Sequence, residues 1–362
     1  MQKKLPVILK NLVSVAFAQL ISGIFWIAGI ALIARYAGTN KFGDFSYIMA
    51  FVNVFQFVAD LGIASILVRE VSREKARLGY YLGNLKSLYW IFSFFSLIII
   101  IFGIRLTTAG PDVHLAAYPA AIATVALFHV FSYVTVFRAF EDMEINSAGL
   151  VLSRLLFLLL VILAIRLEMG LPGIFAALAI SSIALWWGYY IIVSKKYVRP
   201  RLSFDLTAWR FLITEGSSTG GTIILRKTLW YADTFMLKAL ASSAAVGLFN
   251  SVYQIVQMVY LIPWTLAVPF MPVFSRLSKT DPKQLRDMLN NLLKITWLVT
   301  LPLSILTTFA ANDIMRAIYG VKFSMAADGL KIIIWTIPFL FPTGLFFSSL
   351  RPSDVKGRTC FV

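Results

Sequence analysis

The 362-residue sequence has little cysteine, little histidine and few acidic side chains. Its single cysteine, Cys360, excludes an internal disulfide framework and a thiolate cluster for a metal. The two histidines, His114 and His129, are too few for a histidine-based metal site, and His129 is read either as a packed polar residue or as a proton relay. The sequence therefore predicts no metal centre and no catalytic constellation.

Apolar residues dominate instead. Hydrophobic residues make up 59% of the chain, charged residues only 14%, and the mean hydropathy is +0.81. These values exclude a soluble globular domain and indicate an all-α polytopic membrane helix bundle. The apolar windows predict about ten transmembrane helices, at 12–34, 45–67, 87–106, 115–137, 148–167, 173–194, 211–237, 246–270, 292–310 and 329–350.

The formal net charge of +16 reflects membrane topology rather than nucleic-acid binding. Of the 33 Lys and Arg residues, 22 fall in alternate connections that include 69–86, 195–210 and 275–294. The positive-inside rule then places both termini in the cytoplasm, in a multi-pass protein of the cell membrane. The first apolar run continues to Ile33, so we expect a retained helix and no signal peptide. Residues 69–81 are either an interfacial helix or a solvated connector.

The stretch 211–240 is long and apolar enough to cross a bilayer, yet it carries charge. At 100° per residue, one stripe of this helix holds five polar side chains. A charge facing lipid costs about 2.5–3.5 kcal/mol on insertion scales, so the stripe is expected to face a protein interior or a wet cavity. The alternative is an internal Arg–Asp pair that only joins helices. The stripe comprises Glu215, Thr219, Thr222, Arg226 and Asp233.

A weak repeat relates the two halves of the chain. The segment GTNKFGDFSY (38–47) recurs as SSAAVGLFNS (242–251), with Gly43 over Gly247 at an offset of 204 residues. The same offset superimposes two polar helix faces. One face holds Ser46, Asn53 and Asp60, and the other holds Asn250, Gln254 and Gln257.

Parallel repeats of six spans are a transporter plan in which substrate is handled between the halves. We therefore expect an N-terminal six-helix lobe at 1–205, a C-terminal lobe with four helices at 206–350, and a polar cytoplasmic tail at 351–362. The second lobe is expected to be truncated, and a genuine ten-span protein is the alternative.

One long segment carries a family resemblance. The stretch YAGTNKFGDFSYIMAFVNVFQFVADLGIASILVREVSRE (36–74) resembles the polysaccharide-biosynthesis flippases, which are Wzx-like exporters of the multidrug/oligosaccharidyl-lipid/polysaccharide superfamily. The matching positions are Gly38, Phe42-Gly43, Phe45-Ser46, Asp60-Leu61-Gly62, Arg69-Glu70 and Arg73. The stretch 231–255, with Asp233, looks like the family's junction between the seventh and eighth helices.

The resemblance implies a V-shaped bundle of two lobes that moves a polyprenyl-pyrophosphate-linked oligosaccharide to the outer leaflet by alternating access. A headgroup of this kind needs a water-filled route lined by cations and amides, because an unpaired buried anion is very costly. The expected partners are the lipid-linked oligosaccharide, membrane lipids and glycan-assembly proteins, and no nucleic acid.

Each candidate residue has a role and an alternative. Arg226 is the first candidate for the pyrophosphate, since a guanidinium pairs bidentately with phosphate oxygens. Arg154 is the second, and its alternative is packing against a carboxylate such as Glu144. The amides of Asn53, Gln56, Asn250, Gln254 and Gln257 line the sugar route or join helices. Asp60, Glu215 and Asp233 are candidates for a coupling proton or sodium ion, and no other cofactor is expected. The alternative for Asp60 is a cap or an ion pair at the cytoplasmic end, beside Arg69.

Three other functions remain open at this point. An ion-coupled multidrug exporter of the same superfamily would need an acidic cavity, whereas the central helix carries Arg226 and Lys227. A membrane enzyme such as a glycan polymerase, ligase or glycosyltransferase would need a site on a long outer connection. A structural scaffold for glycan assembly is the third alternative.

Overall fold

The computed structural model of the chain describes residues 5–60, 62–106, 110–267, 274, 277–278 and 280–342. Inside these ranges the side chains of 5–14, 16, 57–60, 218–219, 222–224, 226–227 and 260–267 are not described.

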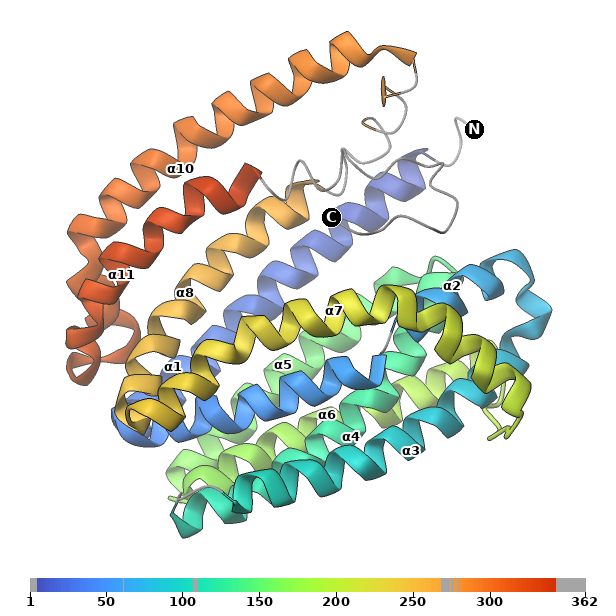
Figure 1. Ribbon diagram of the computed structural model, residues 1–362, viewed down its shortest axis with the longest axis horizontal. Helices are drawn as coiled ribbons and strands as arrows, with labels where there is room; N and C mark the ends of the chain where they lie inside the picture. Colours follow the sequence, from blue (N-terminus) through green and yellow to red (C-terminus); the bar gives the residue numbers. More distant parts are fainter. Residues whose placement is uncertain are drawn as a thin grey trace. The chain divides into compact units, whose positions relative to one another are not determined.

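The described chain is almost entirely helical and contains no strand, which confirms the all-α prediction (Figure 1). Short turns of 3₁₀ helix, η1, η3 and η4, connect the longer elements. In chain order the elements are α1 (Leu5–Asp60), α2 (Ile63–Arg73), η1 (Lys75–Arg77), α3 (Leu78–Arg105), α4 (Pro111–Ala139), α5 (Met143–Arg166), α6 (Gly170–Lys196), α7 (Leu206–Leu240), α8 (Ser243–Ala267), α10 (Pro282–Tyr319), η3 (Val321–Ala326), α11 (Ala327–Ile333) and η4 (Ile334–Thr336).

Seven stretches of the described chain are long and apolar enough to cross a membrane. A helix of about 20 apolar residues spans the hydrocarbon layer, and each of these stretches reaches that length. The predicted window 211–237 is helical, as is the described part of the window 246–270, but neither is among the seven. The seven stretches are Phe17–Gln56, Lys75–Arg105, Pro111–Ala139, Met143–Arg166, Gly170–Lys196, Pro282–Tyr319 and Val321–Pro342.

The boundaries of the first spans differ from the sequence prediction. The gap between the predicted windows 12–34 and 45–67 contains no loop but a kink within α1, where Gly38 has φ 70° and ψ 179°. A side chain at a positive φ is strained, so glycine permits this single-residue break without a loop. The predicted span 45–67 is divided, because α1 ends at Asp60 and α2 begins after Gly62, whose φ is 72°.

Residues 69–81 form no extended connector. The end of α2, the η1 turn and the start of α3 occupy this stretch. α2 buries Ile63, Leu67 and Val71 on one face and exposes Arg69 and Arg73 on the other. The helix is therefore amphipathic, as the period of its apolar residues requires.

The chain divides into two compact units. The larger unit comprises Phe17–Gly247, and the smaller comprises Met1–Ala16 with Leu248–Val362. The division into lobes at residue 205 remains a prediction.

In the larger unit α4 is the central helix, and it packs against α3 and α6 (Figure 1). Most of its apolar span is buried, which explains its many alanines, since small side chains let neighbouring helices approach closely. Tyr133, Phe128 and Phe137 of α4 are almost fully buried in the core.

The polar segment that follows α6 is fixed to α3. Asp205 accepts hydrogen bonds from the backbone of Thr207 and caps the start of α7. Its own backbone N–H donates to Asn84 Oδ1 at 2.9 Å, and Tyr80 donates to its carboxylate. The tyrosine hydrogen bond lowers the pKa of Asp205. The N-terminal end of α7 is therefore held on α3.

Two glycines bring α1 and α8 into backbone contact. A Cβ atom on Gly43 would lie 1.7 Å from the carbonyl oxygen of Ser243, and one on Gly247 would lie 2.1 Å from the carbonyl oxygen of Thr39. No side chain fits at either position. Beside this crossing, Lys238 Nζ lies 2.6 Å from Asp44 Oδ1, and both side chains are largely buried.

The smaller unit contains α10, η3, α11 and η4, which pack on one another. Its buried side chains include Met315, Tyr319, Phe323 and Leu330. The apolar residues Leu298, Leu306 and Phe309 of α10 are exposed, as expected for a helix surrounded by lipid.

Candidate functional site

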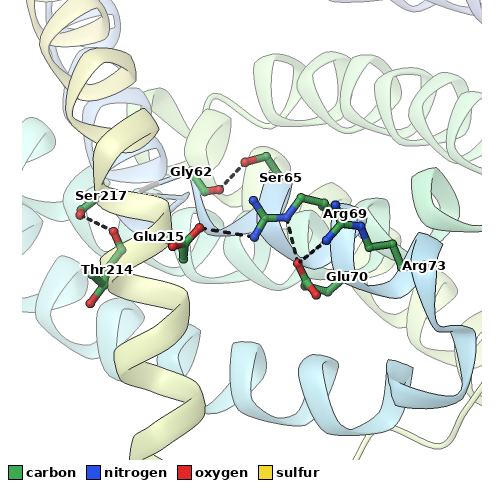
Figure 2. Close-up of polar contacts among 8 residues, drawn as sticks. All are labelled: Gly62, Ser65, Arg69, Glu70, Arg73, Thr214, Glu215 and Ser217. Atoms are coloured by element: carbon green, nitrogen blue, oxygen red, sulfur yellow. Dashed lines mark hydrogen bonds and ion pairs between the residues drawn. The ribbon is translucent and has the colours of Figure 1, made fainter. Parts of the chain in front are cut away.

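A cluster of ion pairs joins α2 to α7 in the larger unit. The Nε of Arg69 lies 2.9 Å from Glu70 Oε1, and its Nη2 lies 3.4 Å from Glu215 Oε2. Figure 2 shows Arg69 between the two carboxylates, with Arg73 on the far side of Glu70. Arg73 Nη1 lies 3.9 Å from Glu70 Oε1. Two guanidinium groups therefore share two carboxylates.

The local sequence places this cluster. Ser65 Oγ donates to the carbonyl oxygen of Gly62 at 2.6 Å and supports the first turn of α2 (Figure 2). Arg69 and Arg73 are separated by one helical turn, so they lie on the same exposed face. α2 also packs against α7, which brings Glu215 to this face.

The carboxylates bound to Arg69 can be exchanged for another anion. The hydrogen bond to Glu70 is the largest influence on Arg69 and raises the pKa of its guanidinium. About half of each side chain is exposed, at 43% for Arg69 and 48% for Glu215. Exposed ion pairs of this kind contribute only about 0–1 kcal/mol, so another anion can replace the carboxylate at small cost. Phosphate oxygens are strong ligands for such a guanidinium.

The two described ionisable residues of the predicted stripe on α7 lie far apart along that helix. Asp233 is exposed and lies 18 residues beyond Glu215, which corresponds to about 27 Å along the helix. Glu215 is ion-paired to Arg69, whereas Asp233 is near the opposite end of α7. The side chain of Arg226 lies outside the described part of the chain, as does that of Asp60. Their roles remain predictions.

Arg154 packs on an aromatic ring. Its guanidinium carbon lies 4.1 Å from the centroid of the Trp26 ring, and Trp26 in turn stacks on Phe157 at 5.2 Å. A cation over an indole face is a favourable contact in a partly desolvated site. This contact joins α1 to α5, and the predicted substrate role of Arg154 remains untested.

The predicted amides belong to different units. Asn53 donates from Nδ2 to the carbonyl oxygen of Met49 at 2.7 Å, within its own helix. Gln56 is half-buried on α1, also in the larger unit. The remaining amides are half-buried on α8 in the smaller unit and comprise Asn250, Gln254 and Gln257.

Sequence reasoning missed one buried cation. Lys86 was expected in a cytoplasmic connection before a span at 87–106, but α3 begins at Leu78 and Lys86 is 8% exposed. Its ammonium donates to Tyr133 Oη at 2.8 Å. A lysine lowers the mean hydropathy of its window, so the predicted span begins after Lys86. In the structure, aromatic rings accommodate the charge within the helix.

Among the described residues no group of three or more His, Cys, Asp or Glu side chains has the arrangement of a metal site. The α2–α7 cluster instead pairs guanidinium groups with carboxylates. Such pairs are suited to exchanging anions rather than to holding a metal.

The seven long apolar helices of the described chain are those of a multi-pass α-helical membrane protein. The chain matches the family described as polysaccharide biosynthesis protein over residues 8–278, and it belongs to that family. Residues 219–354 also match the MatE family. No curated protein matches the sequence.

Several solved structures have a similar fold, and the descriptions of two of them name transporters of the MOP superfamily. The inward closed conformation of the lipid II flippase MurJ has a TM-score of 0.74 and 15% identity, and the match covers 94% of this chain and 76% of that one. An inward-facing MATE family multidrug resistance transporter has a TM-score of 0.65 and 15% identity, with 92% and 81% covered. A Pyrococcus furiosus transporter described as having a binding pocket of reverse polarity has a TM-score of 0.65 and 15% identity, with 94% and 82% covered.

Proposed function

We propose that this protein flips a polyprenyl-pyrophosphate-linked oligosaccharide across the cell membrane by alternating access, for polysaccharide biosynthesis. Membership of the polysaccharide biosynthesis protein family supports the substrate class. The observation that carries the mechanism is the ion-pair cluster of Arg69 and Arg73 with Glu70 and Glu215.

The cluster is suited to receiving pyrophosphate. In this proposal α2 faces the cytoplasm, where the lipid-linked substrate is made, because the basic connections are cytoplasmic. The incoming diphosphate displaces Glu215 from Arg69 and is bound by the two guanidinium groups. Release of Glu215 frees α7 from α2 at this point, which links substrate binding to movement of α7. The headgroup then passes to Arg226, with Arg154 as a second cation.

The proposal keeps the other sequence-based assignments. The N-terminal lobe is 1–205, the C-terminal lobe is 206–350 and residues 351–362 form a cytoplasmic tail. Glycan-assembly proteins are the expected partners besides the lipid-linked oligosaccharide and membrane lipids. The amides are proposed to bind sugar hydroxyls, and Asp60, Glu215 and Asp233 to bind the coupling ion.

A direct test is transport by the purified protein in vesicles. Lipid-linked oligosaccharide is placed in both leaflets, and the fraction that becomes accessible to a glycan-specific enzyme outside is measured over time. The proposal predicts complete accessibility with the protein present and about half without it, since spontaneous crossing of a charged headgroup is negligible. Equal accessibility in both samples would refute it.

A second candidate function is the export of small, often cationic drugs. The match of residues 219–354 to MatE and the fold of the MATE transporter favour it. Resistance of producing cells to cationic dyes distinguishes the two functions. Increased resistance without glycan transport supports drug export.

A further inference from the structure

Three helices of the larger unit enclose a polar cluster with no carboxylate. Lys86 and Trp90 are one turn apart on α3, His129 and Tyr133 on α4, and Trp186 and Tyr190 on α6. α4 packs against both other helices, so these pairs meet in two layers.

The first layer holds the lysine. The Lys86 ammonium lies 2.8 Å from Tyr133 Oη, 5.2 Å from the centroid of the Tyr133 ring and 5.6 Å from that of Tyr190. The two rings and the hydroxyl take the place of a counter-ion, because ring faces attract a cation.

The second layer holds the histidine. His129 is fully buried, and its ring lies 4.4 Å from the Trp90 ring and 4.8 Å from the Trp186 ring, between centroids. Neither Nδ1 nor Nε2 has a hydrogen-bond partner. Ser93 Oγ, also buried on α3, has none either. Buried polar atoms are nearly always hydrogen-bonded, and an unpartnered one costs about 1–3 kcal/mol, so this exception requires an explanation.

The charges on the surrounding helices determine how many protons the cluster can hold. α3 and α6 contain no acidic residue, and the acidic residue of α4, Asp112, lies at the opposite end of that helix. On α5, which also packs against α4, the charged residues are Glu144 in the first turn, Arg154 and Arg166. On the neighbouring α2 and α7, Glu70 and Glu215 are ion-paired to Arg69. Two adjacent bases without a carboxylate favour one positive charge and disfavour two.

We propose that Lys86 and His129 form a binding site for a single proton, and that this proton is coupled to transport. At rest Lys86 Nζ carries the proton and donates a hydrogen bond to Tyr133, while His129 is neutral. The Lys86 ammonium passes its proton to a ring nitrogen of His129, and the imidazolium then releases it to water, so the site alternates between one positive charge and none. The coupling to transport rests on the proposed function, whereas the binding site itself does not. Ionisable groups in membrane spans commonly serve as proton relays.

The small number of histidines allows the protonation of His129 to be measured directly. His114 and His129 are the two histidines, so ¹⁵N-histidine labelling in a His114→Gln background reports on His129 alone. A pH titration by NMR in detergent then follows its protonation. The expected result is a higher midpoint for His129 in Lys86→Met than in the parent protein, because the variant removes the neighbouring positive charge.

Tyr133→Phe provides a second variant that keeps the ring in the core. It removes the hydrogen bond of the ammonium and is expected to move the His129 midpoint in the same direction, by less. If Lys86→Met does not fold, Tyr133→Phe still tests whether the ammonium of Lys86 influences the protonation of His129. A His129 titration that is the same in the parent and in the folded variants would overturn the proton site.

Transport in vesicles tests the coupling separately. A pH gradient across the membrane is expected to accelerate transport by the parent protein, and in His129→Phe the rates with and without the gradient become equal. Acceleration that persists in His129→Phe would overturn the coupling. Absence of any transport by the parent protein would contradict the proposed function and the coupling, and the NMR titration would still decide the site.

Discussion

Gly43 and Gly247 lie in backbone contact, and at both positions a backbone carbonyl of the other segment leaves no room for a side chain. The ideal Cβ of Gly43 meets the carbonyl oxygen of Ser243, and that of Gly247 meets the carbonyl oxygen of Thr39. Each glycine is separated from the equivalent residue of the other segment by 204 residues, as is Thr39 from Ser243. The contact is therefore reciprocal, which is the pattern of a two-fold relationship between equivalent surfaces.

Substitution at this crossing tests how tightly it is packed. Gly43→Ala and Gly247→Ala each place a methyl group against a backbone carbonyl, and overpacking of this kind typically costs about 1–3 kcal/mol. We expect both variants to unfold at a lower temperature in detergent.

Gly188→Ala is the matched control for the crossing. A Cβ atom at this position in α6 has no atom within 4 Å. Alanine is about 1 kcal/mol better than glycine in a helix interior, so this variant is expected to be unchanged or more stable. Equal stability of all three variants would contradict the close contact.

Charge removal at the α2–α7 cluster is expected to affect transport more than stability. In Glu215→Gln the pair with Arg69 is lost, but both side chains are about half exposed, so the free energy of unfolding should change by less than about 1 kcal/mol. We expect a changed dependence of transport on substrate concentration, because Arg69 no longer has to exchange Glu215 for pyrophosphate.

Lys331→Gln is a control for the loss of an exposed ion pair. Lys331 pairs with Asp328 at 2.8 Å within the smaller unit. Its removal should leave transport unaltered. A Glu215→Gln variant with transport kinetics like those of Lys331→Gln would argue against a role for the α2–α7 cluster.

The α4–α5 connection should be sensitive to acid. Burial raises the pKa of Asp142, but hydrogen bonds from Tyr197 and Lys196 outweigh it and hold the pKa below its usual value. A carboxyl group with a lowered folded-state pKa stabilises the fold above its unfolded pKa of about 3.9, and this contribution is lost as the pH falls through the folded pKa.

Asp142→Asn removes this titration. Between about pH 5 and 3, the unfolding temperature of the parent protein should therefore fall more than that of the variant. Tyr197→Phe, which removes one of the two hydrogen bonds, should give an intermediate fall. Parallel curves for the parent and Asp142→Asn would show that this carboxylate does not contribute.

Much of the fold could be predicted from the sequence because long apolar runs specify membrane helices. The windows at 115–137, 148–167 and 173–194 correspond to α4, α5 and α6 within a few residues. The kink at Gly38 could not be distinguished from a loop, since glycine and polar residues accompany both.

The candidate site was less predictable. The stripe on α7 identified Glu215 from helical period alone, but its partner Arg69 is 146 residues away, and only packing of α2 on α7 brings the two together. Lys86 was assigned to a connection because hydropathy penalises any lysine, whereas its ring and hydroxyl neighbours come from two other helices. Such compensation depends on tertiary contacts and leaves no local pattern.

Arg226 provides the sharpest test of the substrate route. Arg226→Ala is expected to abolish transport while membrane insertion and folding stay intact, because the variant removes the guanidinium that is proposed to bind pyrophosphate. Arg226→Lys should recover little activity, since an ammonium group cannot bind bidentately. Wild-type glycan levels at the surface of cells with Arg226→Ala would refute this assignment.

The central claim is that the protein itself moves a lipid-linked oligosaccharide between leaflets. The most direct measurement is the accessible fraction of a polyprenyl-pyrophosphate oligosaccharide in vesicles containing the purified protein and no other protein. We predict that essentially all of the lipid becomes accessible from outside, and that a lipid with the same tail and no sugar is moved less. An accessible fraction equal to that of protein-free vesicles would contradict the account.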